Sequence, residues 1–436
     1  MSKNILFDGL NLGIKQGTGV ATYTRVTAGL ARALGHQTAI LYSRAKLPPR
    51  KPLQGEVIFF DEEPELPVKG AARLALKAMD HLAGLLGTST REVKLEGAVM
   101  TRPLGSRWVP SDRVYAARNI FARAQLQFAL FGRVQNIAFN RSPDVAHWTF
   151  PLPIRARGGA NIYTIHDLVP LRMPYSTLDH KRSYLKLLHK LGQTADHIVT
   201  VSEHSRREII QYLGVDESRV TNTYEAVDIP AVYRDKPAEV LAGELEGLFK
   251  LSPQGYFLFF GALEPKKNIA RLLQAYLGAN VEMPLVMVLS RTWLAESEER
   301  FLEKILQEDR ERRPGERRRV LRFDYLPFPL LMTLLKGARA VVFPSLYEGF
   351  GLPVLEAMTM GTPVITSNVT SIPEVAGDAA MLIDPYDTDA LRRAIQVMAA
   401  DSDLAAGLAE RGLKQAGQFS LATYREKLAA LYARFG

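Results

Sequence analysis

The stretch over residues 340–366 constrains the fold more than any other part of the chain. An apolar run over 340–343 predicts a buried parallel strand. A Gly-x-Gly loop at 349–351 then leads into a helix with Pro353 in its first turn, and a second apolar run follows over 363–366. This strand–loop–helix–strand order is typical of an open α/β sheet. The loop would lie at the carboxyl end of the first strand, where such sheets bind ligands.

Two acidic residues bracket this loop: Glu348 lies within it, and Glu356 lies one turn into the helix. Free backbone N–H groups at a helix N-terminus suit a phosphate. A carboxylate can accept two hydrogen bonds from a pair of neighbouring sugar hydroxyls. The pattern therefore predicts a nucleotide-sugar site. Taken alone, Glu348 could be a solvated loop acid, and Glu356 a first-turn acid favoured by the helix dipole.

A family resemblance supports the site. The segment Pro-Ser-Leu-Tyr-Glu-Gly-Phe-Gly-Leu-Pro-Val-Leu-Glu-Ala-Met over 344–358 resembles the signature of the retaining glycosyltransferases of family GT4. The match continues through Gly-Thr-Pro-Val-Ile at 361–365 and Pro-Glu-Val-Ala-Gly-Asp-Ala-Ala at 373–380. The resemblance implies the GT-B fold, an α/β architecture in which two Rossmann-like domains face each other across a cleft.

We expect three parts in the chain, which is long enough for two cores. The N-terminal, acceptor-side domain is expected over 1–235, with a helical insertion at about 61–141. The C-terminal donor domain is expected over 250–418, after a linker at 229–254 marked by prolines and mixed charge. The last segment, 419–436, is expected to be a helix that returns to the N-terminal domain.

The N-terminal domain begins with a predicted strand over 4–10, and later strands are expected over 38–42 and 56–60. Between them, Gly19 opens a helix predicted over 20–34. The family has a glycine-containing loop here that faces the donor diphosphate and the acceptor, and Gly19 corresponds to it. The alternative is a plain turn glycine.

The helical insertion would hold two segments, 71–86 and 114–139, which are rich in basic and apolar residues. Basic amphipathic helices bind well to anionic bilayers, so the insertion could be an acceptor-binding and membrane-docking subdomain. The other interpretation is a pair of domain-packing helices with solvated basic faces.

A polar pair, His166 and Asp167, ends a strand predicted from Asn161 onward. In GT4 proteins a histidine at this point lies near the donor sugar, so the resemblance places His166 in the site, although histidine is also a common capping residue. Asp167 is expected to orient the following loop. His147 ends the neighbouring strand and could be functional or structural.

The next segments resemble the family less completely. Ser202 is expected to cap a helix. The family commonly has an Asn-Gly pair where this chain has Glu225 and Ala226.

The second domain opens with a strand at 256–261, followed by Glu-Pro-Lys-Lys-Asn. This element resembles the one with which GT4 donor domains begin, and it implies that Lys266 and Lys267 neutralise the donor diphosphate. A cation is needed because the leaving nucleoside diphosphate gains charge as the glycosidic bond breaks. The alternative for these lysines is a solvated loop. Many relatives have an arginine where this chain has Ala262, and either Lys266 or Arg291 could replace it.

The resemblance implies transfer of a sugar, with retention at the anomeric carbon, from a nucleoside diphosphate to an acceptor hydroxyl. His166, Lys267 and Glu348 would be catalytic, with Glu348 against the sugar and Glu356 on the ribose. The donor would also contact a wider set: Gly19, Lys266, Lys267, Gly349, Phe350, Gly351, Leu352 and Glu356. A leaving phosphate oxygen would deprotonate the acceptor, as is proposed for such enzymes.

No cofactor is expected besides this donor substrate, and no metal. An Asp-x-Asp motif is not placed at a strand end, and Asp378 and Asp384 lie in the wrong context.

Composition points to a soluble globular protein with an anionic partner. The chain carries a net charge of +9, has an apolar fraction of 47% and contains no cysteine. It shows neither a signal peptide nor a run long enough to span a membrane. We expect a cytoplasmic protein with peripheral contact to the inner face of the plasma membrane. No nucleic-acid module is evident, so nucleic acid is not an expected partner.

The favoured donor is GDP-mannose, because the Glu-Pro-Lys-Lys-Asn form resembles bacterial mannosyltransferases of polysaccharide and O-antigen assembly. The favoured acceptor is a lipid-linked glycan or polysaccharide, inferred from the basic charge and the region 61–141. UDP-glucose, UDP-N-acetylglucosamine and dTDP-rhamnose remain open as donors. The alternatives to a transferase are a catalytically degenerate GT-B protein acting as a membrane-associated partner, and another nucleotide-sugar enzyme such as an epimerase.

Overall fold

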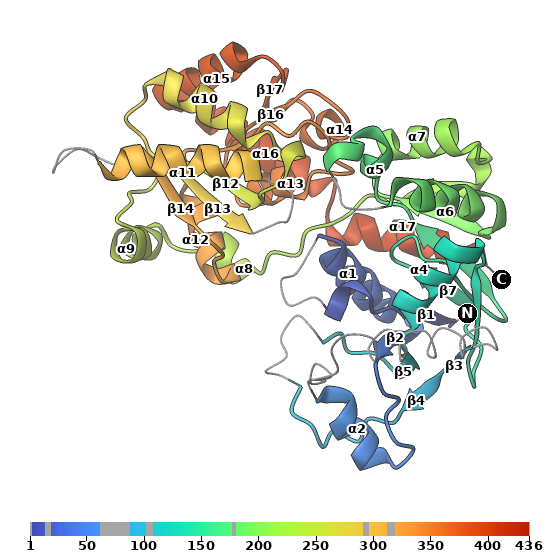
Figure 1. Ribbon diagram of the computed structural model, residues 1–436. Coiled ribbons are helices and arrows are strands. Elements are labelled where there is room, and N and C mark those ends of the chain that lie inside the picture. The colour runs from blue at the N-terminus through green and yellow to red at the C-terminus, as the bar shows by residue number, and fades with distance from the viewer. Residues whose placement is uncertain are drawn as a thin grey trace.

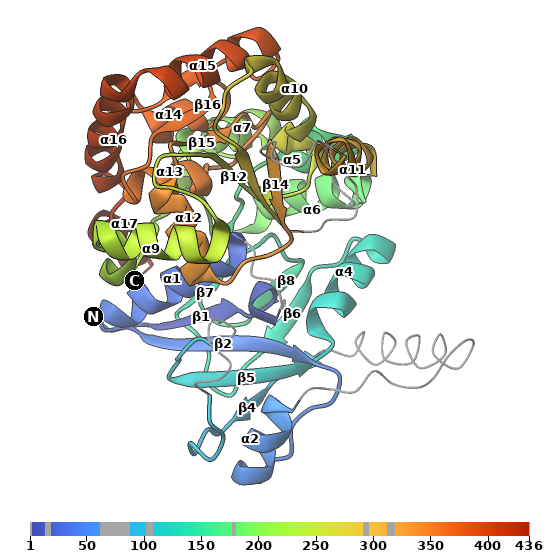
Figure 2. The ribbon, with the colours of Figure 1, turned by 90° about the vertical axis from the view of Figure 1, so that its left-hand side faces the viewer.

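The computed structural model describes residues 2–13, 19–61, 88–101, 108–176, 180–290, 296–311 and 319–435. Within these ranges the chain forms two α/β halves, each built on its own sheet and covered by helices (Figures 1 and 2). The expected architecture of two Rossmann-like domains is confirmed.

The sheet of the first half has eight strands in the order β11-β10-β9-β7-β1-β2-β5-β4. All its strand pairs are parallel except β4 with β5. The strands are β1 (Asn4–Asp8), β2 (Gln37–Arg44), β4 (Arg91–Val93), β5 (Arg113–Arg118), β7 (Val145–Trp148), β9 (Ala160–Thr164), β10 (His197–Thr200) and β11 (Val220–Asn222). A separate three-stranded sheet joins β3 (Thr88–Ser89), β6 (Gln135–Ala138) and β8 (Ile154–Ala156).

The sheet of the second half has six parallel strands in the order β14-β13-β12-β15-β16-β17. They are β12 (Phe257–Ala262), β13 (Leu285–Ser290), β14 (Val320–Phe323), β15 (Ala340–Phe343), β16 (Val364–Ser367) and β17 (Met381–Ile383). The chain runs outward from β12 to β14 and then restarts at β15 on the other side of β12. The strand order therefore reverses between β12 and β15, and ligands of open α/β sheets bind at such a point.

Helices connect the strands of both sheets. Those of the first half are α1 (Gly19–Ala33), α2 (Pro52–Phe60), α4 (Ile120–Phe131), α5 (Val169–Arg172), α6 (Lys181–Thr194) and α7 (Glu203–Leu213). Those of the second are α8 (Ala231–Arg234), α9 (Ala238–Phe249), α10 (Ile269–Ala279), α11 (Glu296–Arg310), α12 (Phe328–Gly337), α13 (Leu352–Thr359), α14 (Ile372–Ala376), α15 (Thr388–Ala400) and α16 (Ser402–Gly417). Short 3₁₀ turns are η1 (Asn11–Gly13), η3 (Pro174–Ser176), η4 (Glu217–Arg219) and η5 (Pro265–Lys267).

The last helix, α17 (Leu421–Ala433), lies against α1 of the first half (Figure 1). The hydroxyls of Tyr424 and Thr27 are 2.7 Å apart, and the hydroxyl of Tyr432 lies 2.9 Å from His147 Nδ1. These buried polar contacts tie the end of the chain to the first sheet.

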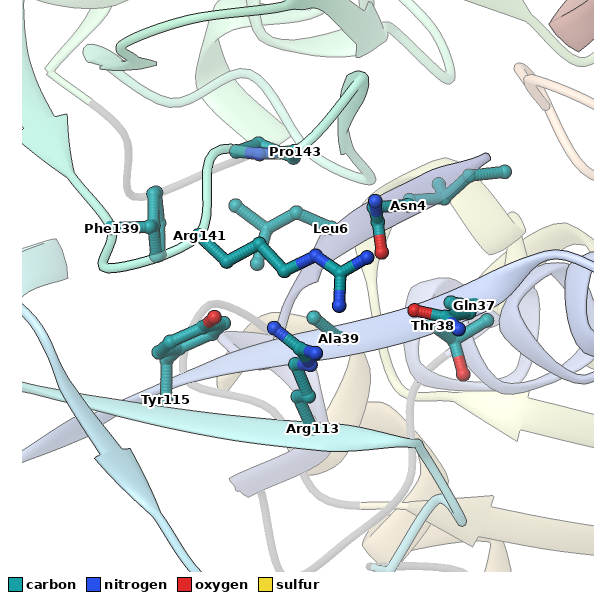
Figure 3. Close-up of a pocket in the computed structure, with 11 residues that line it drawn as sticks. Asn4, Leu6, Gln37, Thr38, Ala39, Arg113, Tyr115, Phe139, Arg141 and Pro143 are labelled. Carbon is teal, nitrogen blue, oxygen red and sulfur yellow. The ribbon is translucent and has the colours of Figure 1, made fainter. Parts of the chain in front are cut away.

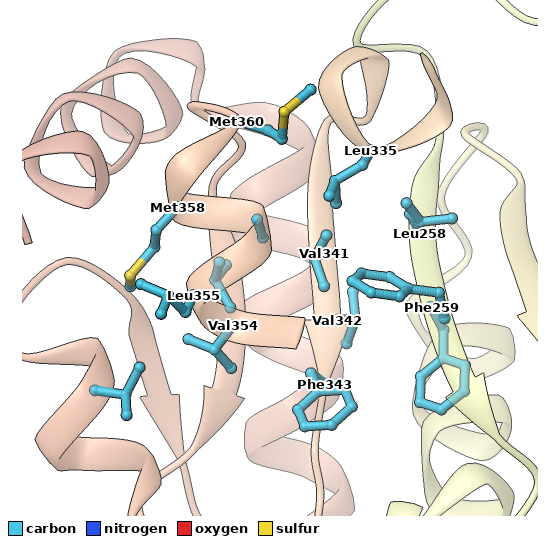
Figure 4. Packing of buried hydrophobic residues seen from close by; sticks show 14 of the residues in the cluster. Leu258, Phe259, Leu335, Val341, Val342, Phe343, Val354, Leu355, Met358 and Met360 are labelled. Atoms are coloured by element: carbon cyan, nitrogen blue, oxygen red, sulfur yellow. The ribbon is translucent and has the colours of Figure 1, made fainter. Parts of the chain in front are cut away.

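Buried apolar side chains hold the loop between β15 and α13 in place from both sides (Figure 4). Phe343 of β15 stacks on Phe259 of β12 at 6.1 Å between ring centroids, and both are fully buried. On the other side, Val354 and Leu355 of α13 are buried in the same core. The loop is therefore fixed at both ends, by a buried strand before it and a packed helix after it.

Two predicted elements of the first half differ from the structure. Residues 56–60 form part of helix α2, not a strand. The helical segment expected over 114–139 is wrong, because the chain there forms β5, α4 and β6; its neighbour, 71–86, lies outside the described residues. The described part of the expected helical insertion is thus α/β, and β5 belongs to the main sheet.

The expected linker at 229–254 contains α8 and α9, and Figure 2 shows α9 beside α12. Leu241 and Leu245 of α9 are buried in the core of the second half. Pro230 and Pro237 stand at the N-caps of these helices, so they start helices where we expected irregular chain.

Candidate active site

The loop between β15 and α13, residues 344–351, lies at the reversal point of the second sheet and against the first half. Gly349 has no room for a side chain, because a Cβ there would come within 2.7 Å of the backbone oxygen of His166. Gly351 has φ of +113°, and a Cβ would meet Ile372 at 2.7 Å. The Gly-x-Gly pattern therefore reflects a close approach between the two halves as well as a turn.

Glu348 and Lys267 form a buried ion pair. Lys267 follows β12 and Glu348 follows β15, and Nζ lies 2.6 Å from Oε1. The Ser345 hydroxyl donates to the same carboxylate oxygen at 2.6 Å. Burial raises the pKa of Glu348, but the charges of Lys267 and Lys266 outweigh burial, so the pKa lies below its ordinary value. Glu348 is thus held as a carboxylate at neutral pH.

Lys266 is less tightly paired. Its Nζ lies 3.7 Å from Glu264, and about a fifth of its side chain is exposed. Burial lowers the pKa of Lys266, but the nearby charges of Glu348 and Asp167 outweigh burial, and the pKa lies above its ordinary value. Lys266 is therefore a cation at neutral pH. Because Asp167 belongs to the first half, this cation interacts with charges from both halves. Arg291, the other residue considered in place of the family arginine, lies outside the described residues.

Glu356 lies on α13 and is half-buried. Burial raises the pKa of its carboxyl group to about 7. Within the described residues no hydrogen bond to this carboxylate is formed. A desolvated acceptor of this kind suits ligand hydroxyls.

Gly19 and Leu352 meet across the two halves, since a Cβ on Gly19 would lie 3.4 Å from Leu352 Cδ1. Phe350 is buried and packs on Phe419 at 5.5 Å between ring centroids. The predicted residues of the loop and of α1 are therefore brought together.

His166 has a partner on each ring nitrogen. Nε2 lies 2.9 Å from the backbone oxygen of Thr149, and Nδ1 lies 3.2 Å from Oε1 of Glu225. The ring of Tyr23 packs edge-on against the imidazole at 4.8 Å. His166 thus lies just after β9, at the carboxyl end of that strand, and its ring nitrogens bind protein groups rather than facing an open space.

His147 has a structural role in the first half. Its side chain is fully buried, with Nδ1 bound to the Tyr432 hydroxyl and Nε2 to the Thr164 hydroxyl, both at 2.9 Å. Burial, together with the charge of His166, lowers the pKa of His147 to about 3. Asp167 accepts from the backbone N–H of Val169 at 3.0 Å, so it orients the following loop.

Sequence reasoning missed contacts that join the halves beside this loop. Tyr347 donates to Glu208 of α7, and Glu374 of α14 accepts from the backbone N–H groups of Glu203 and His204, at 2.6 and 3.2 Å. The Glu374 carboxylate therefore lies at the N-terminus of α7, where the helix dipole favours negative charge. Tyr347 and Glu374 both lie within family-like segments, but nothing there indicated their partners.

A small hollow lies elsewhere, at the amino end of the first sheet (Figure 3). Its volume is about 20 Å³, and the side chains of Arg113 and Arg141 point into it above Leu6 and Ala39. It lies at the opposite edge of the sheet from His166 and is separate from the loop site.

Two glycosyltransferase family models match the chain, one in each half. A family model described as "Glycosyl transferases group 1" matches residues 244–415, and one described as "Glycosyltransferase Family 4" matches 93–229.

Two curated relatives are mannosyltransferases. The O-antigen chain mannosyltransferase B of Escherichia coli is 38% identical over 265 residues, which are 59% of this chain and 66% of that protein. The serotype-specific mannosyltransferase WbdA of Escherichia coli is 31% identical over 298 residues, which are 65% of this chain and 36% of WbdA. The match thus spans just under two thirds of the first relative and about a third of the second.

Among solved structures, a glycosyltransferase from Rickettsia africae matches with a TM-score of 0.60 at 16% identity. The alignment covers 100% of this chain and 98% of that one. At this identity the likeness shows the fold alone, and it extends over both halves.

Proposed function

The chain belongs to the glycosyltransferases of group 1 and family 4, with the GT-B fold, and from this membership we propose that it transfers a sugar, with retention, from a nucleoside diphosphate to a glycan acceptor. One observation carries the proposal. The lysines after β12 and the carboxylate after β15 meet at the reversal point of the donor-side sheet, and Gly349 of the same loop approaches the backbone oxygen of His166.

Each site residue has a role in this reaction. The transition state carries positive charge on the sugar and negative charge on the departing diphosphate, so the protein has to position groups and stabilise charge. Lys266 and Lys267 would face the diphosphate, together with the backbone N–H groups of residues 349–352. Glu348 would lie against the sugar. Glu356, which lacks a protein partner among the described residues, would accept from the ribose hydroxyls.

The acceptor hydroxyl must lose a proton, and we propose that a leaving phosphate oxygen takes it. Glu348 is a buried carboxylate paired with Lys267, and its lowered pKa makes it a weak base for this proton. The described residues contain no group of three or more His, Asp or Glu side chains that could hold a metal ion. Independence from metal stays a prediction.

GDP-mannose is the proposed donor. Its support is that both curated relatives are named mannosyltransferases and that one is an O-antigen chain enzyme. The proposed acceptor is accordingly a lipid-linked or polysaccharide chain of a bacterial surface glycan.

Peripheral contact with an anionic membrane is proposed for the first half. Its support is the net charge of +9 together with apolar side chains exposed on α2 and α4, among them Leu53, Val57, Leu130 and Phe131. No described helix is long and apolar enough to cross a bilayer.

A nucleotide-sugar panel tests the transferase. GDP-mannose, UDP-glucose, UDP-N-acetylglucosamine and dTDP-rhamnose are scored by thermal shift and slow hydrolysis. We expect one donor to stabilise the protein and to turn over, with turnover lost in Glu348→Ala and kept in Glu410→Ala, whose exposed carboxylate lies on α16. Absence of any donor response from folded protein would favour a catalytically degenerate partner protein.

Vesicle binding tests the membrane contact. Arg123 is buried, so the informative charges of residues 113–133 are the exposed Arg118 and Arg133. We expect Arg118→Gln/Arg133→Gln to weaken sedimentation with phosphatidylglycerol vesicles, and Arg393→Gln on α15 to leave it unchanged. Equal binding by both variants and the wild type would contradict the proposal.

A further inference from the structure

We propose that Glu225 is a positioning residue that holds His166 in its doubly protonated form and thereby fixes the edge of the donor site that the first half supplies. The consequence for the donor rests on the proposed transferase function. The protonation of the ring is a property of the folded chain and can be measured without any donor.

The geometry of the ring requires two protons. The Thr149 carbonyl oxygen lies 2.9 Å from Nε2, and a Glu225 carboxylate oxygen lies 3.2 Å from Nδ1. Both oxygens only accept hydrogen bonds, whereas a neutral imidazole carries a single N–H. A neutral ring would therefore leave one nitrogen lone pair facing an acceptor oxygen. The imidazolium form satisfies both contacts.

The ring is not free to turn away from these acceptors. Thr149 donates from its backbone N–H and its hydroxyl to the same oxygen of Asp8, at 2.5 and 2.9 Å, and this anchors its carbonyl. Tyr23 of α1 packs edge-on against the imidazole, and the Tyr23 hydroxyl lies 3.0 Å from Thr164 Oγ1. The orientation of His166 is thus set from α1, β7 and β9 together.

The surrounding charges favour the same state. Burial lowers the pKa of His166, but the hydrogen bond and charge of Glu225, the Thr149 carbonyl and the charge of Asp167 outweigh burial, so the pKa lies above its ordinary value. Tyr23 faces the ring from α1 with a pKa raised to about 12 by burial, and is neutral. His147 faces it from β7 with a pKa lowered to about 3, and is also neutral. His166 is therefore the one histidine of the pair that is charged.

His166 also contacts the donor loop. Its backbone oxygen accepts from the Ser205 hydroxyl at 3.0 Å and lies where a Cβ on Gly349 would come within 2.7 Å. A shift of His166 would therefore change how closely the Gly-x-Gly loop approaches. A deprotonated ring would leave the Glu225 charge unbalanced on the side of the donor site that the first half supplies, and repulsion of the anionic donor would weaken its binding.

The chemistry of the side chain at position 225 decides the state of the ring. An amide there could donate to a neutral histidine nitrogen, so it would not require a charged ring. The Glu225 carboxylate can only accept, so it favours the doubly protonated form of His166.

Nitrogen NMR of histidine-labelled protein tests the ring directly. The chain has eight histidines, and the His166 signals are assigned by their loss in His166→Asn. At neutral pH we expect both ring nitrogens of His166 to be protonated in the wild type. In Glu225→Gln we expect a neutral ring protonated at Nε2 alone, because the amide N–H can donate to Nδ1. Glu217→Gln, at an exposed carboxylate, serves as the matched control.

A neutral His166 in the wild type would overturn the proposal, and this measurement needs no variant to fold. An unchanged His166 spectrum in folded Glu225→Gln protein would also overturn the proposal.

The second readout is the pH dependence of GDP-mannose affinity. We expect wild-type Kd to rise by tenfold or more as the pH passes the NMR-measured pKa of His166, and the Glu225→Gln profile to be flat there. A flat wild-type profile would overturn the link to the donor. Absence of binding at every pH, for all donors of the panel, would instead reject the proposed function, while the NMR result would still decide the protonation state.

Discussion

Replacing Lys267 by Met should destabilise the donor half by about 3 kcal/mol, because it leaves the Glu348 carboxylate buried without its main partner. The two groups are 2.6 Å apart, and each side chain is about one-tenth exposed. Breaking such a pair by removing one partner costs about 3–5 kcal/mol. We take the lower end, because the Ser345 hydroxyl and the charge of Lys266 remain beside Glu348.

A double-mutant cycle turns this estimate into a test. Glu348→Gln should cost about 1–2 kcal/mol, since the amide oxygen can still accept from Lys267. The double variant Lys267→Met/Glu348→Gln leaves no unpaired charge, so it should cost about 2–3 kcal/mol rather than the sum, giving a coupling of about 2 kcal/mol. Urea unfolding followed by circular dichroism measures all three, and Lys267→Met should lower Tm by about 6–12 °C.

The sign of the pH dependence provides a second check. The lowered pKa of Glu348 contributes stability that is present above the ordinary glutamate pKa of 4.5 and is lost as the pH falls through the folded value. The gap between the wild type and Lys267→Met should therefore shrink in acid. Lys414→Met removes an exposed pair of similar length, 2.7 Å, and should have no measurable effect. Additive costs in the cycle would refute the reasoning.

Three further outcomes are expected. His147→Gln should reduce the loss of stability in acid: with a folded pKa of about 3, the neutral His147 makes the wild type lose about 2 kcal/mol between pH 6.5 and 4.5 in a urea titration. Glu356→Gln should remove a weakening of donor affinity that the wild type shows as the pH falls below about 7, where this carboxylate protonates. Glu374→Ala should weaken the contact between the two halves by about 1–2 kcal/mol, which X-ray scattering would detect as a larger radius of gyration. Asp378→Ala, at an exposed residue, should leave the radius of gyration unchanged.

The donor half was predictable from the sequence because its signals are local. Buried parallel strands appear as continuous apolar runs, and glycine and proline mark where they end. Both strands around the Gly-x-Gly loop, β15 and β16, lie within one residue of the predicted ranges. Ser202 caps α7 by accepting from the N–H of Ser205, as its type suggested.

The errors in the first half arise where tertiary contacts override local preference. Residues 56–60 resemble a strand, yet they are helical: the Glu56 carboxylate accepts from the N–H groups of Glu96 and Val99, and Phe59 packs on Val93. The alanine-rich run from 114 looked helical but forms β5, with Asn119 in the left-handed region at φ of 43° ending the strand.

The His166 partnership could not be found from the sequence. Glu225 lies 59 residues from His166, and the departure from Asn-Gly gave no indication of its partner. The same holds for Tyr347, whose contact with Glu208 spans 139 residues. Motifs identify residues that act within one loop or helix. Pairings between loops of different halves depend on how the halves meet, which local patterns do not encode.

The candidate site therefore has a part that is built within one half and a part that exists only when the halves meet. The Lys267–Glu348 pair and Ser345 all belong to the donor half, so their geometry survives if the halves separate. The close approach of Gly349 to the His166 carbonyl is lost if the halves separate, because the two residues belong to different halves. Since the Glu225-held imidazolium lies on the first half, its charge contributes to the donor site only when the two halves meet at Gly349 and His166.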